Sequence, residues 1–295
     1  MPIPIIFIHK NIHNGDNSYL NYSLSQAHLL NPQSPIYLIT DDVKNKKCFV
    51  NYVPLNEYYE EAEKFEKIYK HMSTNDYIHE LFCFQRWFII KMFLKKNGIN
   101  DFLYLDSDVL LFCNIEKELK NLQGIYDFTI CNKIGPQCTY FTAKENLLKF
   151  CEFIYQLYTN PKYYIRLEEK HQKHINNNLP GGVCDMTAFG EYQHHAMGKV
   201  KDLAQIENNS VFDDNINVSD GFEMNGKEIK NIIIKNEGAY CKQLSTGRII
   251  RFNSLHFQGG GKKYMFKFYI GKNLKQQRII DRFKVIKNII IKHLA

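Results

Sequence analysis

Two carboxylates, Asp106 and Asp108, stand one residue apart directly after an apolar run. Neighbouring acids repel each other and are costly to desolvate unless a cation or a proton joins them. A divalent metal that also holds phosphate oxygens would meet this need, and hard oxygen ligands suit Mn²⁺ or Mg²⁺. An Asp-x-Asp pair is also common in plain acidic turns. The position of this pair at the end of a buried strand is what indicates a metal site.

A second polar stretch, His-Phe-Gln-Gly-Gly-Gly-Lys, runs from His256 to Lys262 and complements the acids. An imidazole can complete an oxygen-rich metal site, and Gly259 and Gly261 let backbone amides surround a diphosphate. Lys262 adds a point charge for a phosphate. A glycine-rich turn with a lysine is common, so this stretch indicates phosphate binding only in combination with the two acids.

Apolar patterns predict the elements that position these groups. The apolar run from Phe102 to Leu105, which leads into the two acids, is typical of a central strand covered on both faces, and another apolar run follows from Val109 to Phe112. Near the N-terminus, a strand over Pro4 to His9, a helix over Ser18 to Leu30 and a strand over Ile36 to Thr40 form a β-α-β unit. Such a unit is typical of a nucleotide-binding half-sheet.

Polar residues in these elements are candidates for nucleotide contacts. His9 and Asp41 stand at the ends of the two N-terminal strands, although acids at strand ends are also common turn formers. A helix is expected from Leu81 to Lys95, and Arg86 interrupts its aromatic segment. Arg86 is either a surface residue beside a core face or a guanidinium held near phosphate.

The rest of the chain contains further expected elements. We expect a strand over Asp127 to Asn132, a helix over Lys144 to Tyr158, β segments over Ile229 to Ile234 and Arg248 to Leu255, a surface excursion over Glu57 to Lys70 and a lid or partner-facing segment over Asn160 to Leu179. Gly181 and Gly182 allow close backbone approach and place Asp185 at the start of a helix. Asp185 is therefore either a simple helix cap or a functional acid.

Charge is concentrated in the C-terminal tail. The net charge is +7, but from Lys262 onward eight Lys and two Arg face one acid, Asp281, so the remaining chain is slightly acidic. Nucleic acid is excluded as a partner because the body lacks a basic-aromatic motif. From Leu274 onward, apolar residues recur in steps of three or four, which predicts a basic amphipathic helix within residues 266–295. This helix either packs on the rest of the chain or docks on an anionic membrane.

The sequence predicts a cytoplasmic protein, with peripheral attachment to the inner face of the membrane as the further option. The start lacks a basic segment and a small-residue cleavage site, so no secretory signal is evident. No window reaches the ~20 apolar residues of a membrane span. The 8 cysteines include no Cys-x-x-Cys pair, so we expect reduced and mostly buried thiols.

With both motifs identified, the chain resembles metal-dependent glycosyltransferases of the GT-A fold. The apolar strand followed by Asp-Ser-Asp matches their acidic motif, and His256 to Lys262 looks like the His-x-x-Gly-x-x-Lys element of the glycogenin-like and lipopolysaccharide galactosyltransferase family. The resemblance spans Ile3 to Tyr264. Two departures matter: Lys263-Tyr264 stands where the family often has Pro-Trp, and Gly182 to Thr187 stands where it has an Asp-Gln-Asp helix start.

The resemblance implies a Rossmann-like central mixed sheet flanked by helices. It implies one catalytic domain over residues 1–265, with a nucleotide-sugar half over about 1–112 and an acceptor half over about 113–265. In that family the two acids and the histidine bind Mn²⁺ and the lysine contacts the diphosphate. This implies metal roles for Asp106, Asp108 and His256 and a diphosphate role for Lys262.

The implied activity is transfer of a hexose or N-acetylhexosamine from a nucleotide sugar, with UDP expected, to a glycan or lipid-linked acceptor. The resemblance further implies retention of anomeric configuration and a place in polysaccharide biosynthesis. Arg86 stands where the family has a helix arginine near the nucleotide sugar. Asp185 is the acid expected to position sugar or acceptor hydroxyls.

Two other classes of function stay open. A phosphohydrolase of the haloacid dehalogenase type also uses a strand ending in Asp-x-Asp, and Val211-Phe212-Asp213-Asp214 could serve as its later acidic pair. A complete β-α-β unit before Asp106 argues against it, since those enzymes open with the acidic strand. A non-catalytic sugar-binding module is the second alternative, but it would not need a diphosphate loop.

Overall fold

The computed structural model describes residues 2–12, 17–42, 46–226 and 228–272, together with Leu274, Ile279, Arg282, Phe283 and Ile286. It contains two compact units that are interleaved along the chain. The first unit comprises Met1–Gly15, Pro35–Leu105 and Leu119–Asp202, and the second comprises Asp16–Ser34, Asp106–Glu118 and Leu203–Ala295.

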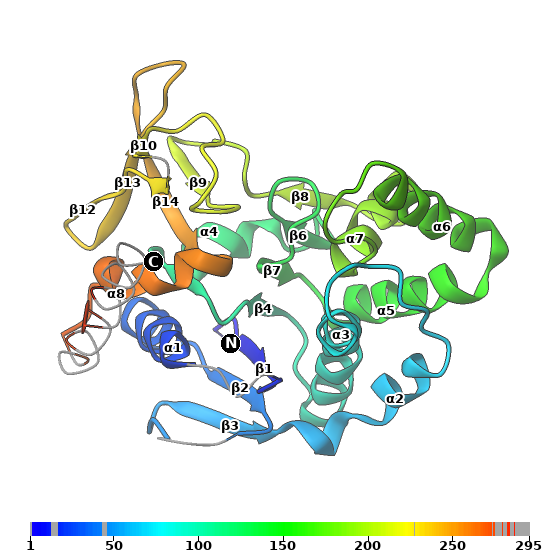
Figure 1. Cartoon of the computed structure of the whole chain (residues 1–295). Helices are drawn as coiled ribbons and strands as arrows, with labels where there is room; N and C mark the ends of the chain where they lie inside the picture. The colour runs from blue at the N-terminus through cyan, green and yellow to red at the C-terminus, as the bar shows by residue number, and fades with distance from the viewer. Residues whose placement is uncertain are drawn as a thin grey trace. The chain divides into compact units, whose positions relative to one another are not determined.

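The first unit is built around a mixed sheet with the strand order β3-β2-β1-β4-β7-β6-β8 (Figure 1). Its strands are β1 (Ile5–His9), β2 (Ile36–Thr40), β3 (Val50–Pro54), β4 (Phe102–Leu105), β6 (Phe128–Ile130), β7 (Cys138–Phe141) and β8 (Val200–Asp202). The first four strands of that order run parallel, whereas β7 runs antiparallel to β4. All residues of β4 are buried, as expected for an apolar run at the centre of a covered sheet.

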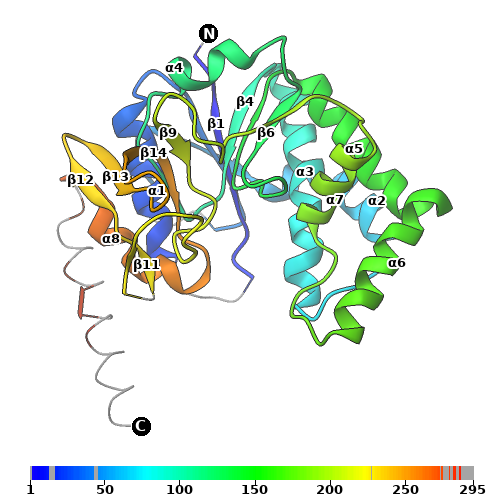
Figure 2. The ribbon, with the colours of Figure 1, turned by 90° about the horizontal axis from the view of Figure 1, so that it is seen from above.

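The helices of the first unit gather on one side of this sheet (Figures 1 and 2). They are α2 (Glu60–Glu66), α3 (Tyr77–Asn97), α5 (Lys144–Thr159), α6 (Pro161–Asn176) and α7 (Asp185–His194), with short 3-10 turns η1 (Leu55–Tyr58) and η2 (Lys120–Leu122). The Asp76 carboxylate caps α3 by accepting a hydrogen bond from the His79 amide at 3.0 Å. Trp87 of α3 is fully buried, and its ring meets Phe189 of α7 with centroids 5.2 Å apart.

One segment that we expected to be a surface excursion belongs to the core. Within Glu57 to Lys70, Ala62 and Phe65 on α2 have no exposed surface, and the Phe65 ring stacks on Phe88 of α3 at 5.0 Å. The prediction was wrong because the charged residues lie on one side of α2 and a few large apolar residues suffice on the other.

The second unit holds a sheet with the order β12-β13-β14-β5, β9 beside β14, and a separate β10-β11 pair. Its strands are β5 (Val109–Leu111), β9 (Ser210–Phe212), β10 (Met224–Asn225), β11 (Ile229–Lys230), β12 (Ile233–Lys235), β13 (Gly238–Lys242) and β14 (Ile249–His256). Its helical elements are α1 (Ser18–Leu30), α4 (Ile115–Leu119), η3 (Gly259–Tyr264) and α8 (Met265–Phe268). The last residue of α4, Leu119, belongs to the first unit. The amide of Gln26 on α1 donates to the Leu111 carbonyl on β5 at 2.6 Å.

The apolar runs before and after Asp106 and Asp108 form two separate strands, and the first of them ends at the acids, as predicted. β4 ends at Leu105, and β5 begins at Val109 and pairs with β14 of the second unit. Between them the chain turns, and the Val109 amide donates to the Asp106 carbonyl at 3.1 Å. The polar Asp-Ser-Asp triplet interrupts the apolar pattern, and its carboxylates would be desolvated inside a continuous buried strand.

The predicted basic tail helix lies mostly outside the described residues. Of the positions on its apolar face, Ile279, Phe283 and Ile286 are described, with 53%, 67% and 52% of their surface exposed. Among the residues that the structure describes, no helix has both the length and the apolar character needed to cross a membrane. Six of the cysteines are buried, as expected.

Candidate active site

Strand pairing within the second unit brings the two acids and the histidine together. β14 runs antiparallel to β5 and places His256 opposite Val109. The Phe257 amide donates to the Asp108 carbonyl at 3.0 Å, which fixes this register at the strand ends. One ligand atom from each of Asp106, Asp108 and His256 lies within 4.8 Å of the others, and Asp108 and His256 are each only 7% exposed.

The ring of His256 has a defined orientation. Its Nδ1 lies 2.5 Å from the Asp214 carbonyl oxygen. Because a carbonyl can only accept, Nδ1 carries the proton, and Nε2 faces the Asp108 carboxylate at 3.5 Å. Metal-bound histidines commonly donate their second ring nitrogen to such an acceptor, which leaves the other nitrogen for the metal.

Lys262 lies in the glycine-rich turn η3 beside the acids. Its Nζ is 3.2 Å from Oδ2 of Asp108 and 4.9 Å from the ring centroid of Tyr19 on α1. Gly259 has φ +55°, a conformation that favours glycine. A Cβ on Gly261 would lie 3.1 Å from the Asn217 side chain, so glycine allows η3 to approach that loop closely.

Opposite charges stabilise each other in this cluster. Burial alone would raise the pKa of Asp108, but the hydrogen bond and charge of His256, together with Lys262, hold that pKa below its ordinary value. Burial alone would lower the pKa of His256, but Asp108 and Asp106 raise it to about 9. The pKa of Lys262 is also raised, because Asp108 outweighs the effect of burial.

The donor set fits a hard divalent cation. Two carboxylates and one neutral imidazole are suitable ligands for Mn²⁺ or Mg²⁺, and the Nδ1 contact of His256 directs its Nε2 to the carboxylates. A second grouping in the described residues, Glu191, His194 and His195 of the first unit, fits a cation less well. The Arg166 guanidinium already lies 3.4 Å from the Glu191 carboxylate.

Arg86 and Asp185 meet in the first unit, although 99 residues separate them in sequence. Oδ2 of Asp185 accepts hydrogen bonds from Nε and Nη2 of Arg86, at 3.1 and 2.5 Å, and from the Trp87 indole at 3.0 Å. Arg86 also donates to the Tyr104 hydroxyl at 2.7 Å. Asp185 is 3% exposed, so the guanidinium neutralises a buried carboxylate.

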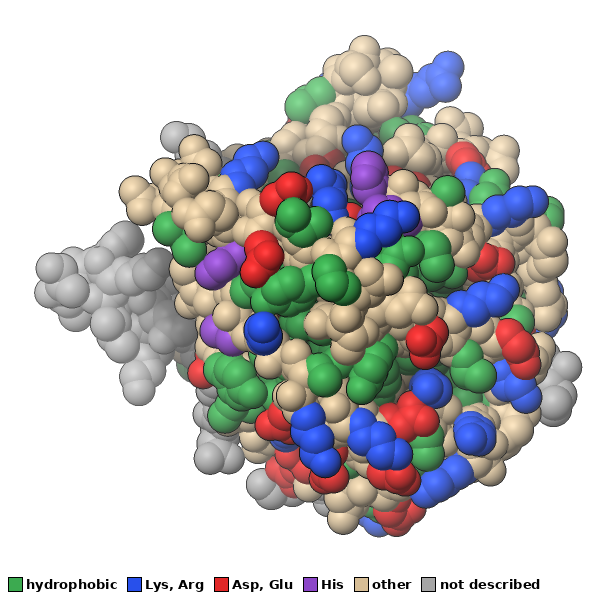
Figure 3. Space-filling model, turned by 90° about the vertical axis from the view of Figure 1, so that its right-hand side faces the viewer, with side chains coloured by type: hydrophobic (Ala, Val, Ile, Leu, Met, Phe, Trp, Pro, Cys, Tyr) green, Lys and Arg blue, Asp and Glu red, His purple; other side chains and the backbone are tan. Residues whose placement is uncertain are grey.

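The loop before Asp185 is built as its glycines predicted. A Cβ on Gly182 would lie 2.2 Å from the Met72 carbonyl oxygen, so only glycine fits there, and α7 begins at Asp185. This loop and the end of α6 border a cavity of about 460 Å³, lined by Ser73, Thr74, His171, His174, Ile175, Asn178, Leu179, Pro180 and Gly181. On the face that carries α6, hydrophobic side chains lie among charged ones (Figure 3).

His9 and Asp41 lie at neighbouring strand ends of the first-unit sheet, as expected for adjacent parallel strands. His9 is the last residue of β1 and pairs with Thr40, the last residue of β2. The Asp41 carboxylate accepts a hydrogen bond from the Asn11 amide at 3.0 Å, so it joins the loops that follow the two strands. This contact is compatible with a turn-forming role as well as with nucleotide binding.

Sequence reasoning missed three residues that surround the cluster of acids, histidine and Lys262. Tyr19 lies against Lys262, and Asp213 accepts a hydrogen bond from the His256 amide at 3.1 Å. Lys230 is buried against Asp213 at 2.8 Å. Asp213 had been considered only as part of the alternative acidic pair. No local pattern distinguishes Lys230 from a surface lysine.

Comparisons with known proteins bear on the fold. No protein-family model matches the chain, and no curated protein matches its sequence. Among solved structures, mouse xyloside xylosyltransferase 1 in its apo form matches with a TM-score of 0.50 and 10% identity, over 72% of this chain and 88% of that one. The apo bifunctional glycosyltransferase WbbM gives 0.49 at 8% identity, over 95% of this chain and 51% of that one. Galactosyltransferase LgtC with donor and acceptor sugar analogues gives 0.44 at 10% identity, over 94% of this chain and 100% of that one.

The match to the xylosyltransferase has a TM-score of 0.50, and at 10% identity the likeness concerns the fold alone. The central mixed sheet flanked by helices agrees with that likeness. The chain therefore has the mixed α/β fold of the GT-A glycosyltransferases, as its two motifs had led us to expect.

Proposed function

We propose that this chain is a metal-dependent glycosyltransferase. It moves a hexose or N-acetylhexosamine from a nucleotide sugar, with UDP as the expected nucleotide, to a glycan or lipid-linked acceptor, with retention of anomeric configuration. The observation that carries this proposal is the cluster of Asp106, Asp108 and His256 beside Lys262 in a chain of GT-A fold. Two acids, an imidazole and an ammonium group form a site for a cation together with a diphosphate.

The residues of the cluster have separate tasks in this reaction. When bound by Asp106, Asp108 and His256, Mn²⁺ or Mg²⁺ supplies charge that stabilises the diphosphate leaving group. Breaking the sugar–phosphate bond places negative charge on that group, and Lys262 presents an ammonium group to it. Added Cβ atoms at Gly259 and Gly260 would meet nothing within 4 Å, so a phosphate can approach this backbone closely.

For the first unit we propose roles that rest on the family resemblance. His9 and Asp41 contact the nucleotide, Arg86 lies near the donor sugar, and Asp185 positions sugar or acceptor hydroxyls. One oxygen of Asp185 accepts three hydrogen bonds. These contacts support the role of Asp185 as a fixed hydrogen-bond acceptor rather than as a nucleophile. We also propose that residues 1–265 act as one catalytic domain, with the two halves assigned above.

The phosphohydrolase alternative loses its second acidic pair. Asp213 is 2% exposed and both of its oxygens are engaged, one by Lys230 and one by the His256 amide. The Lys230 ammonium already neutralises this buried carboxylate, so the observed pairing favours the transferase.

The tail leads to a further proposal about location. We propose a cytoplasmic enzyme of polysaccharide biosynthesis whose basic tail, residues 266–295, docks on an anionic inner membrane surface near a lipid-linked acceptor. The charge of the tail supports this, since each Lys or Arg near such a surface can add ~1 kcal/mol. Co-sedimentation with anionic vesicles, comparing the full chain with one that ends at Gly271, tests it. Equal binding by both chains contradicts it.

The central test measures nucleotide binding and release. We expect UDP with Mn²⁺ to raise the unfolding temperature, and expect a panel of UDP sugars with glycan acceptors to release UDP. The matched control is Asp108→Asn. A phosphohydrolase would instead release inorganic phosphate from simple phosphate esters, and a binding module would bind sugar without releasing nucleotide. Stabilisation by UDP that persists unchanged in excess EDTA would contradict the metal assignment.

A further inference from the structure

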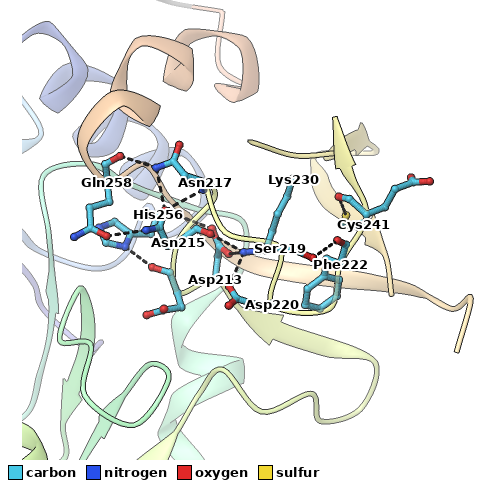
Figure 4. A network of polar contacts seen from close by, with 12 residues as sticks. Asp213, Asn215, Asn217, Ser219, Asp220, Phe222, Lys230, Cys241, His256 and Gln258 are labelled. Atoms are coloured by element: carbon cyan, nitrogen blue, oxygen red, sulfur yellow. Dashed lines mark hydrogen bonds and ion pairs between the residues drawn. The ribbon is translucent and has the colours of Figure 1, made fainter. Parts of the chain in front are cut away.

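Lys230, the last residue of β11, is buried in the second unit with 1% of its side chain exposed. Its Nζ donates to Oδ1 of Asp213 at 2.8 Å, to Oδ2 of Asp220 at 2.9 Å and to the Asn215 carbonyl at 2.6 Å (Figure 4). An ammonium group has three donors, and these contacts use all of them. A lysine is almost never buried unless it is paired in this way.

The Asp213 carboxylate also contacts His256, the candidate metal ligand. Oδ2 of Asp213 accepts a hydrogen bond from the His256 backbone amide at 3.1 Å (Figure 4). The next residue, Asp214, provides the carbonyl that accepts from Nδ1 of the His256 ring. Two consecutive residues thus hold both the backbone and the ring of His256, and Lys230 fixes the first of them.

The loop that follows is fastened to the same strand end. The Ile216 amide donates to the His256 carbonyl at 2.9 Å, and the Asn217 side chain donates to the Gln258 carbonyl at 2.7 Å. The Lys230 backbone amide donates to the Ile216 carbonyl at 2.8 Å. The loop from Asp213 to Asp220 therefore joins Lys230 to the segment that presents His256.

The charges favour this arrangement. Burial alone would lower the pKa of Lys230, but Asp213 and Asp220 outweigh it and raise that pKa above its ordinary value. Lys230 therefore remains cationic. Because a well-packed apolar residue often stabilises a core as well as a buried ion pair does, a buried pair is better explained by the geometry that it fixes.

We propose that Asp213 and Lys230 are positioning residues for the metal site. Lys230 fixes one oxygen of Asp213, the other oxygen fixes the His256 backbone, and the adjacent carbonyl holds the ring so that Nε2 faces Asp108. This role rests on the proposed metal-dependent function and deepens it. Partners of this kind, one step removed from the metal, typically contribute 10–100-fold to metal affinity.

The test measures Mn²⁺ affinity of the full chain by electron paramagnetic resonance of free Mn²⁺. In Asp213→Asn the amide offers one acceptor to two donors, Lys230 and the His256 amide, so we expect affinity to fall about 10–100-fold. The double variant Asp213→Asn, Lys230→Met removes one donor and should recover part of that loss. The matched control is Asp220→Asn, which contacts Lys230 but not His256 and should stay within about threefold of the parent chain.

A second readout needs no metal. At a pH above the raised pKa of His256, where the ring is neutral, the ¹⁵N shifts should show a proton on Nδ1 in the parent chain and a mixture of ring tautomers in Asp213→Asn. If that variant fails to fold, Lys230→Met with the same two readouts decides the question. Equal Mn²⁺ affinity and ring shifts in parent and folded variants would overturn the positioning role alone. A parent chain that binds no Mn²⁺ would overturn both this role and the proposed metal site.

Discussion

In the metal-free protein, the His256–Asp108 pair should make the stability of the fold depend on pH. Burial opposes protonation of His256, but Asp108 and Asp106 outweigh it and raise the pKa to about 9, from the ordinary 6.5. A raised folded-state pKa means that the folded protein holds this proton more tightly than the unfolded chain. The resulting stabilisation is complete below about pH 6.5 and is lost as the pH rises through about 9.

The size of this effect follows from the two pKa values. At about 1.4 kcal/mol per pKa unit, the interval from 6.5 to about 9 corresponds to ~3.5 kcal/mol of unfolding free energy. His256 is only 7% exposed, so screening by solvent is small. This is a large share of the stability of a typical domain, which makes the effect measurable.

The assay is urea unfolding in EDTA from about pH 6 to pH 10, for the parent chain, His256→Asn and a control at the exposed residue His79, His79→Asn. We expect the unfolding free energy of the parent to exceed that of His256→Asn by ~3.5 kcal/mol more at the low end of this range than at the high end. The control should follow the parent throughout. With saturating Mn²⁺ the added stability should grow with pH, because the imidazole must lose its proton to bind metal. A constant difference between parent and His256→Asn would refute the assigned ion pair.

Three further predictions concern single side chains. Asp108→Asn should abolish Mn²⁺-dependent UDP binding while circular dichroism stays unchanged; retained binding would contradict the ligand role. Lys262→Ala should raise the KM for donor about 10–150-fold and leave the KM for acceptor unchanged, because a charge-assisted contact contributes about 1.5–3 kcal/mol; the reverse pattern would place Lys262 at the acceptor. Arg86→Met should lower the unfolding free energy by about 3–5 kcal/mol, since it leaves the Asp185 carboxylate buried without its cation, and adding Asp185→Asn should recover part of this loss.

Regular elements with a clear local pattern could be predicted from the sequence. The helix over Ser18 to Leu30 and the strand over Ile36 to Thr40 have the expected bounds, because apolar spacing and the following Asn31-Pro32 define them locally. Elements whose burial depends on partners distant in the sequence could not be predicted in this way. Phe65 becomes a core residue only through Phe88 of another helix.

The candidate site divides in the same way. Asp106, Asp108, His256 and Lys262 could be selected because each belongs to a short motif whose residue types already indicate metal and phosphate chemistry. The sequence singled out Arg86 and Asp185 separately, but nothing local indicates that they pair with each other. Lys230 carried no signal at all, since its role depends on three acceptors that only the folded loop brings together.

Two lysine–aspartate pairs in the second unit show how burial separates two roles for the same chemistry. The side chain of Lys262 is 37% exposed, and its ammonium group contacts Asp108 at 3.2 Å. Because water can solvate both charges while they separate, the ammonium group can leave that carboxylate and bind a phosphate. Lys230 is 1% exposed and is held by three acceptors, so its departure would leave the Asp213 carboxylate buried without a cation. The exposed lysine is therefore suited to bind a ligand that comes and goes. The buried one is suited to hold His256 in a single orientation.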